Sequence, residues 1–250
     1  LILEGGTPDG RFEHEPEPTA TNLADLLPKI AAAGADVGFF QDPDADRLAI
    51  ATADGRYIGE EGTLALAVDH VLGHTPGPIV INCSTSMMAA EIAARHGVAC
   101  HMAAVGEANV VDLMLAERAV LGGEGNGGVI DPRVGLVRDS FAAMALVLDR
   151  MCAGDAITPL ADLAAALPRL VMKKTKIDLT PRLRGAALAA GIDRIEQAFP
   201  AATASRLDGL RLDWHGGWLL IRGSNTEPIV RLVAEAADEA SVDDAIARAA

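Results

Sequence analysis

Short apolar runs of strand length alternate with runs of helical length between Gly59 and Gly154, and this alternation constrains the fold more than any other feature of the chain. The expected strands are 78–82, 98–102 and 119–121, and the expected helices are 60–72, 85–96, 107–117 and 138–151. Repeated alternation of this kind favours a mixed α/β domain in which helices cover a largely parallel sheet.

The flanking regions have a different character. Residues 1–22 are rich in proline and glycine and read as loop. Further expected elements before residue 59 are a helix that begins at Asn22 and ends at Gly34, and strands 37–40, 48–52 and 56–58. After Pro168 the expected elements are strands 169–179, 210–214, 218–222 and 229–236, and helices 182–199 and 241–249, the last capped by Ser241. The predicted class is therefore α/β, with mixed three-layer α/β structure followed by a smaller α+β domain, and with boundaries near residues 53 and 167.

Composition narrows the function classes. Half of the 250 residues are hydrophobic, which is ample for one or two cores, yet no apolar run approaches the ~20 residues that span a bilayer. A net charge of −14 disfavours nucleic acid as a partner. The three cysteines lack CxxC spacing and no signal peptide is evident, so we expect a soluble, cytoplasmic protein.

Three carboxylates occupy alternate positions in the segment QDPDADRLAI, between two expected strands. In an extended loop alternate side chains fall on one side, so Asp42, Asp44 and Asp46 can converge as oxygen ligands for Mg²⁺. The alternative is a solvated acidic turn, and the pattern alone leaves both open.

Two further loops carry polar groups at strand ends. The segment GGEGNGG (122–128) follows an expected strand, and its glycines would allow a ligand close to the backbone, with Glu124 and Asn126 reading sugar hydroxyls. The segment RGSNTEP (222–228) combines a guanidinium, hydroxyls, an amide and backbone N–H groups suited to a phosphate. A flexible hairpin tip and a polar turn are the respective alternatives.

Taken in order, the three loops resemble those of the α-D-phosphohexomutases: phosphoglucomutase, phosphomannomutase and phosphoglucosamine mutase. The metal loop is similar in Asp42, Asp44, Asp46 and Arg47, and the sugar loop in Gly123-Glu124. The phosphate loop is similar in the residues Arg222, Ser224, Asn225, Thr226 and Pro228. The segments GGEGNGGVI and VGEANV look most like the phosphoglucosamine mutase branch of archaea and some bacteria.

The resemblance implies a division into the end of the second family domain (1–53), the third domain (54–167) and the C-terminal fourth domain (168–250). It also implies a first domain with a phosphoserine in a Ser-His-Asn-Pro-type loop, which this sequence lacks. Because the chain begins at Leu1 within a turn-rich segment, we expect a fragment whose partner is that missing domain. This fragment alone is then expected to be inactive.

The resemblance further implies an Mg²⁺-dependent isomerase that interconverts hexose 6-phosphate and hexose 1-phosphate through a bisphosphate. Asp42, Asp44 and Asp46 would hold the metal, and Arg47 would neutralise charge during phosphoryl transfer. The substrate-binding residues would be Glu124, Asn126, Arg222, Ser224, Asn225 and Thr226. The sequence leaves the preferred hexose phosphate, the general acid or base and the oligomeric state open.

Two alternatives stay open. The substrate could be that of a phosphomannomutase or phosphoglucomutase, or the chain could be a non-catalytic sugar-phosphate-binding module. The sequence also departs from many members of the family, which carry histidine at the positions of Glu107 and Gly128. Glu107 could serve the site, or it could simply begin a helix, where acidic residues are favoured.

Overall fold

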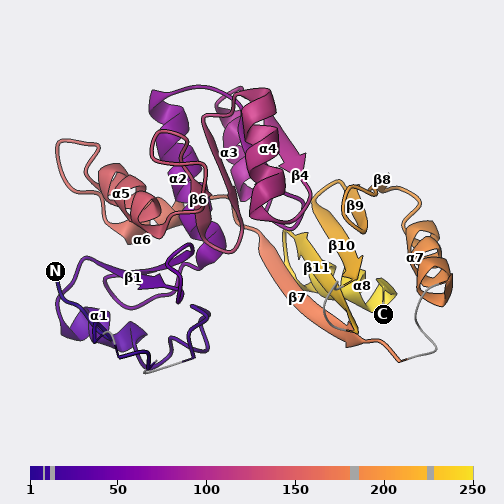
Figure 1. Ribbon diagram of the computed structural model, residues 1–250, viewed down its shortest axis with the longest axis horizontal. Helices are drawn as coiled ribbons and strands as arrows, with labels where there is room; N and C mark the ends of the chain where they lie inside the picture. Colours follow the sequence, from indigo (N-terminus) through magenta and orange to yellow (C-terminus); the bar gives the residue numbers. More distant parts are fainter. Residues whose placement is uncertain (8, 12–14, 181–185, 224–227, 250) are drawn as a thin grey trace. The chain divides into compact units, whose positions relative to one another are not determined.

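Two hydrophobic cores lie in the part of the chain that the structure describes, and each belongs to one of two compact units. The computed structural model describes residues 1–7, 9–11, 15–180, 186–223 and 228–249 (Figure 1). The first unit comprises Leu1–Met102 and Gly106–Pro168, and the second comprises Ala103–Val105 and the chain from Arg169 onward. The larger core draws on residues from Leu48 to Leu163, and the smaller on residues from Phe199 to Ala249.

The first unit begins with one short helix and an antiparallel strand pair. Helix α1 (Leu27–Ala32) precedes β1 (Val37–Gln41), which pairs with the fully buried strand β2 (Leu48–Thr52). The predicted helix start at Asn22 is wrong. The Asn22 side chain donates to the Glu17 carbonyl at 2.9 Å and so stabilises a turn instead of capping a helix.

A four-stranded sheet in the order β4-β3-β5-β6 forms the centre of the first unit. Strands β3 and β5 are parallel, and β5 and β6 are antiparallel. The strands are β3 (Ile79–Asn82), β4 (Cys100–Ala103), β5 (Leu121–Glu124) and β6 (Gly128–Ile130). The helices are α2 (Glu60–His74), α3 (Met88–Arg95), α4 (Glu107–Glu117), α5 (Ser140–Met151) and α6 (Leu160–Ala165).

The helices lie on both faces of this sheet. A Cβ atom on Gly122 would meet Met114 of α4, and one on Gly123 would meet Leu64 of α2. Because successive strand residues face opposite sides, α4 and α2 cover opposite faces, and the arrangement is a three-layer α/β/α domain as predicted. Among the described residues, no helix combines the length and apolarity that a membrane crossing requires.

Several predicted boundaries in this unit are wrong, for local reasons. The expected strand 56–58 reduces to one bridge between Ala51 and Tyr57. Helix α3 begins at Met88 instead of residue 85, because Thr85 Oγ1 donates to Asn82 Oδ1 and Ser86 Oγ accepts the N–H of Met88. Strand β6 and helix α6 were not predicted.

In the residues that the structure describes, the second unit is a five-stranded antiparallel sheet with two helices, which confirms the smaller α+β domain. The strand order is β7-β11-β10-β9-β8, so the first strand of the unit pairs with the last. The strands are β7 (Val171–Asp178), β8 (Thr203–Ser205), β9 (Leu210–Trp214), β10 (Gly217–Gly223) and β11 (Ile229–Ala236). The helices are α7 (Ala186–Ala198) and α8 (Glu239–Ala249). Asp238, not Ser241, caps α8, since its carboxylate accepts the Ser241 N–H at 2.8 Å.

Candidate functional site

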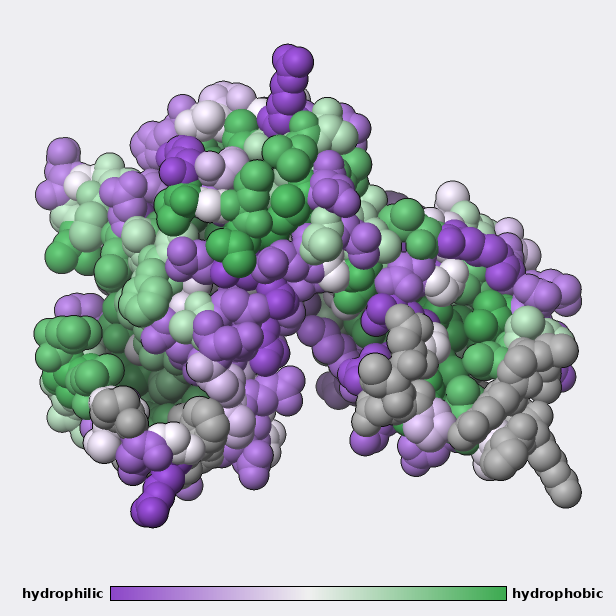
Figure 2. Space-filling view, in the orientation of Figure 1, coloured by the Kyte–Doolittle hydropathy of each residue, from purple (hydrophilic) through white to green (hydrophobic). Residues whose placement is uncertain are grey.

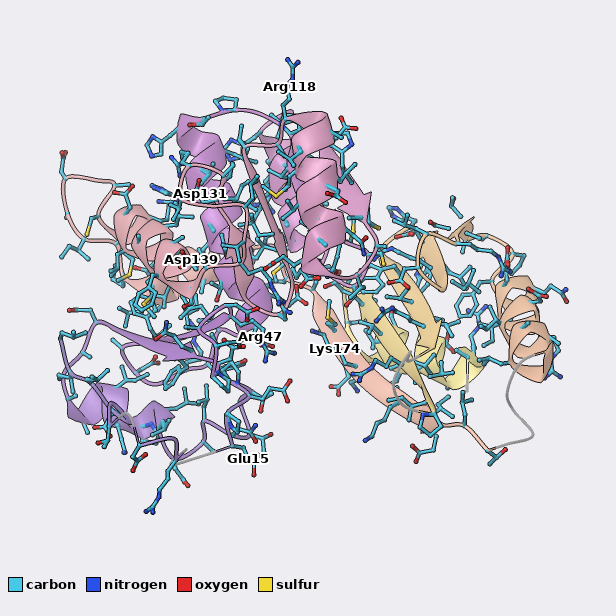
Figure 3. The ribbon with its side chains drawn as sticks, viewed as in Figure 1. Glu15, Arg47, Arg118, Asp131, Asp139 and Lys174 are labelled. Atoms are coloured by element: carbon cyan, nitrogen blue, oxygen red, sulfur yellow. The ribbon has the colours of Figure 1, made fainter. Side chains whose placement is uncertain are left out.

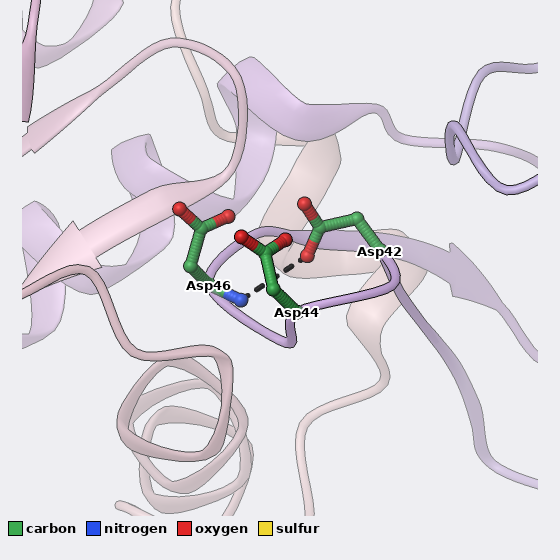
Figure 4. Close-up of side chains that lie close together, drawn as sticks. All are labelled: Asp42, Asp44 and Asp46. Atoms are coloured by element: carbon green, nitrogen blue, oxygen red, sulfur yellow. Dashed lines mark hydrogen bonds between the residues drawn. The ribbon is translucent and has the colours of Figure 1, made fainter.

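The acidic loop, Asp42–Arg47, joins β1 to β2 and brings its three aspartates together. Gln41 and Leu48 are paired across the two strands, so the loop is closed at its base. One carboxylate oxygen from each of Asp42, Asp44 and Asp46 lies within 4.8 Å of the others. Figure 4 shows the three side chains pointing to a common centre. The three carboxylates therefore converge as predicted, although the loop is a turn, closed by the Ala45 N–H to Asp42 carbonyl bond of 3.1 Å, and not the extended segment that was expected.

Hydrogen bonds within the loop hold this shape. The Asp42 carboxylate accepts the backbone N–H groups of Asp46 at 3.1 Å and Arg47 at 3.0 Å, and the Arg47 Nε–H at 2.6 Å. Ala45 adopts a left-handed backbone with φ of 57°, which an L-residue other than glycine rarely takes. Both N–H and Oγ of Ser140, the first residue of α5, donate to the Ala45 carbonyl, so α5 fixes the tip of the loop.

The carboxylates of the loop differ in their electrostatic environment. Burial alone would raise the pKa of Asp42, but the hydrogen bonds from Arg47 hold this pKa below its usual value. Burial raises the pKa of Asp46 to about 6, and the neighbouring Asp42 and Asp44 raise it too, while Arg138 opposes the shift. Crowded carboxylates of this kind favour binding of a cation, which would relieve their repulsion.

The donor set fits a small divalent cation. Carboxylate oxygens are the ligands that Mg²⁺ prefers, and around Mg²⁺ opposite ligands lie about 4 Å apart. One oxygen of each aspartate lies within 4.8 Å of the others, so the three side chains are near enough to approach a single ion. Arg47 is the last residue of the acidic loop and is labelled in Figure 3. The same part of the first unit is covered by hydrophilic residues in Figure 2.

The glycine-rich segment forms the hairpin of β5 and β6, with a turn of only three residues, 125–127. The expectation of a loop over 122–128 is wrong at its ends, which are buried strands. The glycines are needed for contacts within the protein. A Cβ atom on Gly127, whose φ is 85°, would lie 2.3 Å from the Leu48 carbonyl oxygen, and one on Gly128 would lie 2.3 Å from Arg138 Cδ. The Leu48 N–H also donates to the Gly127 carbonyl at 3.1 Å, which joins the hairpin to the end of the acidic loop.

Glu124 lies at the end of β5 and is only 4% exposed. Its Oε1 accepts Asn82 Nδ2 at 2.6 Å and the Gly106 N–H at 2.9 Å, and its Oε2 accepts Arg138 Nη1 at 2.7 Å. A carboxylate offers about four acceptor sites, so roughly one remains for a ligand. Asn126 is the one partly exposed residue of the Leu121–Ile130 hairpin, and its Oδ1 accepts the Gly128 N–H at 3.2 Å.

Residues that the sequence analysis did not single out hold the two loops. The Asn82 Oδ1 accepts Thr85 Oγ1–H, and Thr85 Oγ1 in turn accepts the Gly125 N–H, each at 2.9 Å. Arg138 ion-pairs with both Asp46 and Glu124, and therefore links the acidic loop to the hairpin. The residue directly precedes Asp139, the N-cap of α5 (Figure 3), and no local sequence pattern marks it as part of a site.

The third predicted loop belongs to the second unit. Arg222 is the last residue but one of β10 and donates from Nε to the Asp208 carboxylate at 2.9 Å. Ser224, Asn225 and Thr226 lie outside the described residues. The predicted phosphate-binding role of this loop therefore stays a prediction.

Comparison with known proteins gives the family. The models of phosphoglucomutase/phosphomannomutase match domain II over residues 1–55, the α/β/α domain III over 60–171 and the C-terminal domain over 182–250. The chain belongs to the phosphoglucomutase/phosphomannomutase family, the phosphohexomutases. The resemblance predicted from the three loops is thereby confirmed.

Relatives and solved structures agree with this assignment. A probable phosphoglucosamine mutase of Methanopyrus kandleri is 31% identical over 96% of this chain and 52% of its own length. A phosphoglucomutase/phosphomannomutase of Thermococcus kodakarensis is 34% identical with the same coverage. The crystal structure of a phosphoglucomutase/phosphomannomutase family protein from Burkholderia thailandensis matches with a TM-score of 0.77 and 28% identity, over 95% of this chain and 51% of that one. The chain thus spans about half the length of the relatives it matches.

Proposed function

We propose that this chain provides the cation-binding and sugar-binding parts of an enzyme that interconverts hexose 6-phosphate and hexose 1-phosphate. The observation that carries the proposal is the convergence of three aspartates beside a hairpin that presents Glu124 and Asn126. Family membership supports the reaction class. An Aspergillus fumigatus N-acetylphosphoglucosamine mutase, with the same fold at a TM-score of 0.60 and 18% identity over 84% of this chain and 47% of its own, was solved with GlcNAc-6P and magnesium.

The residues of the acidic loop would hold Mg²⁺ through one oxygen each of Asp42, Asp44 and Asp46. When bound, Mg²⁺ supplies Lewis-acid stabilisation of a transferring phosphoryl group. Arg47, which Asp42 holds in place, would offer its remaining N–H groups to the phosphate oxygens. Phosphoryl transfer depends mainly on positioning and charge, so these groups suffice for this half of a site.

The hairpin would bind the sugar. Glu124 would accept a hydrogen bond from a sugar hydroxyl at its remaining acceptor position, and the partly exposed Asn126 amide would contact a neighbouring hydroxyl. The segment from Arg222 through Ser224, Asn225 and Thr226 would hold the phosphate that does not react. The phosphoserine that donates phosphate would come from outside these residues.

We further infer the division 1–53, 54–167 and 168–250 as the end of domain II, domain III and domain IV. The matched ranges of the family models and the change of core near Pro168 support these boundaries. Phosphoglucosamine mutase is the favoured activity, because several relatives, including that of Methanopyrus kandleri, carry this name. The relative from Thermococcus kodakarensis favours phosphomannomutase/phosphoglucomutase as the second candidate.

The test has a binding part and an activity part. Isothermal titration of MgCl₂ into the chain should give saturable binding, and Asp44→Ala should weaken it on the order of tenfold or more, since a charged ligand is lost. Asp25→Ala removes an exposed carboxylate outside the acidic loop and should leave binding unchanged. The protein that carries this chain should convert glucosamine 6-phosphate faster than mannose or glucose 6-phosphate. Equal Mg²⁺ affinity in Asp44→Ala would refute the cation site, and turnover by residues 1–250 alone would refute the need for an external phosphoserine.

A further inference from the structure

Arg138 contacts three carboxylates that come from three separate segments of the first unit. Its Nη2 pairs with Asp46 of the acidic loop, its Nη1 with Glu124 of β5 at 2.7 Å, and its Nε with Glu107 of α4 at 3.3 Å. The backbone N–H of Arg138 also donates to Glu107, at 2.9 Å. Each nitrogen of the guanidinium therefore has an acidic partner, in the planar fork geometry that arginine provides and lysine does not.

The aliphatic stem of the Arg138 side chain is held in place as well as its guanidinium group. Its Cδ lies 2.3 Å from the position that a Cβ atom on Gly128 would occupy, so the side chain crosses the hairpin where glycine leaves room. On the other side, the next residue, Asp139, caps α5 by accepting the N–H groups of Phe141 and Ala142. Arg138 is thus held between the start of a helix and the hairpin.

We propose that Arg138 is a positioning residue that couples cation binding at the acidic loop to the orientation of Glu124. This inference rests on the proposed function of those two groups. Arg138 holds Oδ2 of Asp46 within the acidic loop, and by holding Oε2 of Glu124 it sets the orientation of the carboxylate that would face the sugar. One rigid guanidinium binds both carboxylates, so a change in the position of either carboxylate alters the position of the other.

The role of Glu107 follows from the same geometry. Its carboxylate accepts both the side chain and the backbone N–H of Arg138, and so fixes the plane of the guanidinium. Carboxylates that bind a metal are commonly oriented by such outer partners, and removal of a partner typically costs 10- to 100-fold in metal affinity.

The test compares two perturbations of Arg138 with a matched control. Arg138→Lys keeps the charge but loses the fork, and Gly128→Ala leaves Arg138 intact but displaces its stem. The control Arg133→Lys alters another arginine on the same connection, which pairs with Asp131. Isothermal titration with MgCl₂ should show affinity reduced about tenfold in the first two proteins and unchanged in the control.

A second readout follows the hairpin directly. The Gly106 N–H donates to Glu124, so its NMR shift should move with Mg²⁺ occupancy in the wild-type chain and in Arg133→Lys. In Arg138→Lys and Gly128→Ala, the chemical shift of the Gly106 amide should not change on addition of Mg²⁺, even at concentrations that saturate the binding site. If Arg138 only stabilised the fold, its substitution would lower the melting temperature, but the Gly106 amide shift would still change on addition of Mg²⁺.

The outcomes separate the two proposals. Wild-type protein that binds no Mg²⁺ would overturn the cation site and this inference together. Wild-type protein that binds Mg²⁺, with equal affinity and an equal Gly106 response in Arg138→Lys and Gly128→Ala, would overturn the coupling role of Arg138 alone. If Arg138→Lys fails to fold, the Gly128→Ala result decides.

Discussion

Replacement of Gly127 by alanine tests the contact between the acidic loop and the hairpin. Gly127 has a φ of 85°, and alanine in a left-handed conformation costs about 1 kcal/mol. The new Cβ would also lie 2.3 Å from the Leu48 carbonyl oxygen, so the chain must separate there. Separation would break the bond from Leu48 N–H to Gly127 and that from Thr63 Oγ1 to Leu48, about 1 kcal/mol each. We therefore expect a loss of about 3 kcal/mol.

Gly97 provides the matched control in the same unit. It has a φ of 69°, yet a Cβ there would meet nothing within 4 Å, so Gly97→Ala should cost only the backbone term of about 1 kcal/mol. Urea denaturation followed by circular dichroism gives the free energy of unfolding of both variants. Both tryptophans, Trp214 and Trp218, lie in the second unit, so their fluorescence identifies the transition of that unit. Equal losses in the two variants would refute the steric argument for Gly127.

Three smaller predictions concern the support of the first unit. Asp139→Ala should cost about 1 kcal/mol in urea denaturation, because the carboxylate caps α5, whereas Asp139→Asn should recover most of the loss. Tyr57→Phe should cost about 1 kcal/mol, since the phenol donates to the Pro18 carbonyl at 2.9 Å; no loss would mean that water replaces the bond. Hydrogen bonds from Arg133 outweigh burial and hold the pKa of Asp131 below its ordinary 3.8, so this carboxylate stabilises the fold above that value. Asp131→Asn should therefore be less stable at pH 7, by about 1 kcal/mol given the exposure of Arg133, and the difference should shrink as the pH falls below about 4. A difference in unfolding free energy that does not change with pH would contradict the assignment of the loss to the charged Asp131 carboxylate.

The sequence predicts best the elements whose bounds depend on local patterns. Strands β2 and β11 match the expected ranges: β2 is a compact apolar run, and β11 is largely apolar although it contains Arg231 and Glu235. Helix α4 matches because Gly106 precedes its first helical residue. The helix expected at Asn22 fails because hydrogen bonds to the preceding turn compete with capping. Local pattern alone does not weigh such competing partners.

The candidate site also has one part that the sequence predicts and another that it does not. The convergence of Asp42, Asp44 and Asp46 is predicted correctly, but by a route that the structure does not follow: the loop is a turn with a left-handed Ala45 and an Ala45 N–H to Asp42 carbonyl bond of 3.1 Å, not an extended segment. The glycines of the hairpin are explained only by what they meet, because Met114, Leu64 and Leu48 approach them from distant segments. Their dense spacing suggested a ligand, whereas the close contacts are made by the protein itself.

The charge balance explains why the two loops have to be considered together. Among the described residues, Arg47 pairs with Asp42, Asp46 and Glu17, and Arg138 pairs with Asp46, Glu107 and Glu124, while Asp44 lies beside Asp42 and Asp46. Each guanidinium already occupies oxygens of the aspartates, so a bound cation has to use the oxygens that remain. Since Arg138 also holds Glu124, relieving the repulsion at the acidic loop changes the balance of forces on the Glu124 carboxylate. A substitution in either loop should therefore alter both Mg²⁺ affinity and the geometry of the hairpin, and neither quantity alone would reveal its effect.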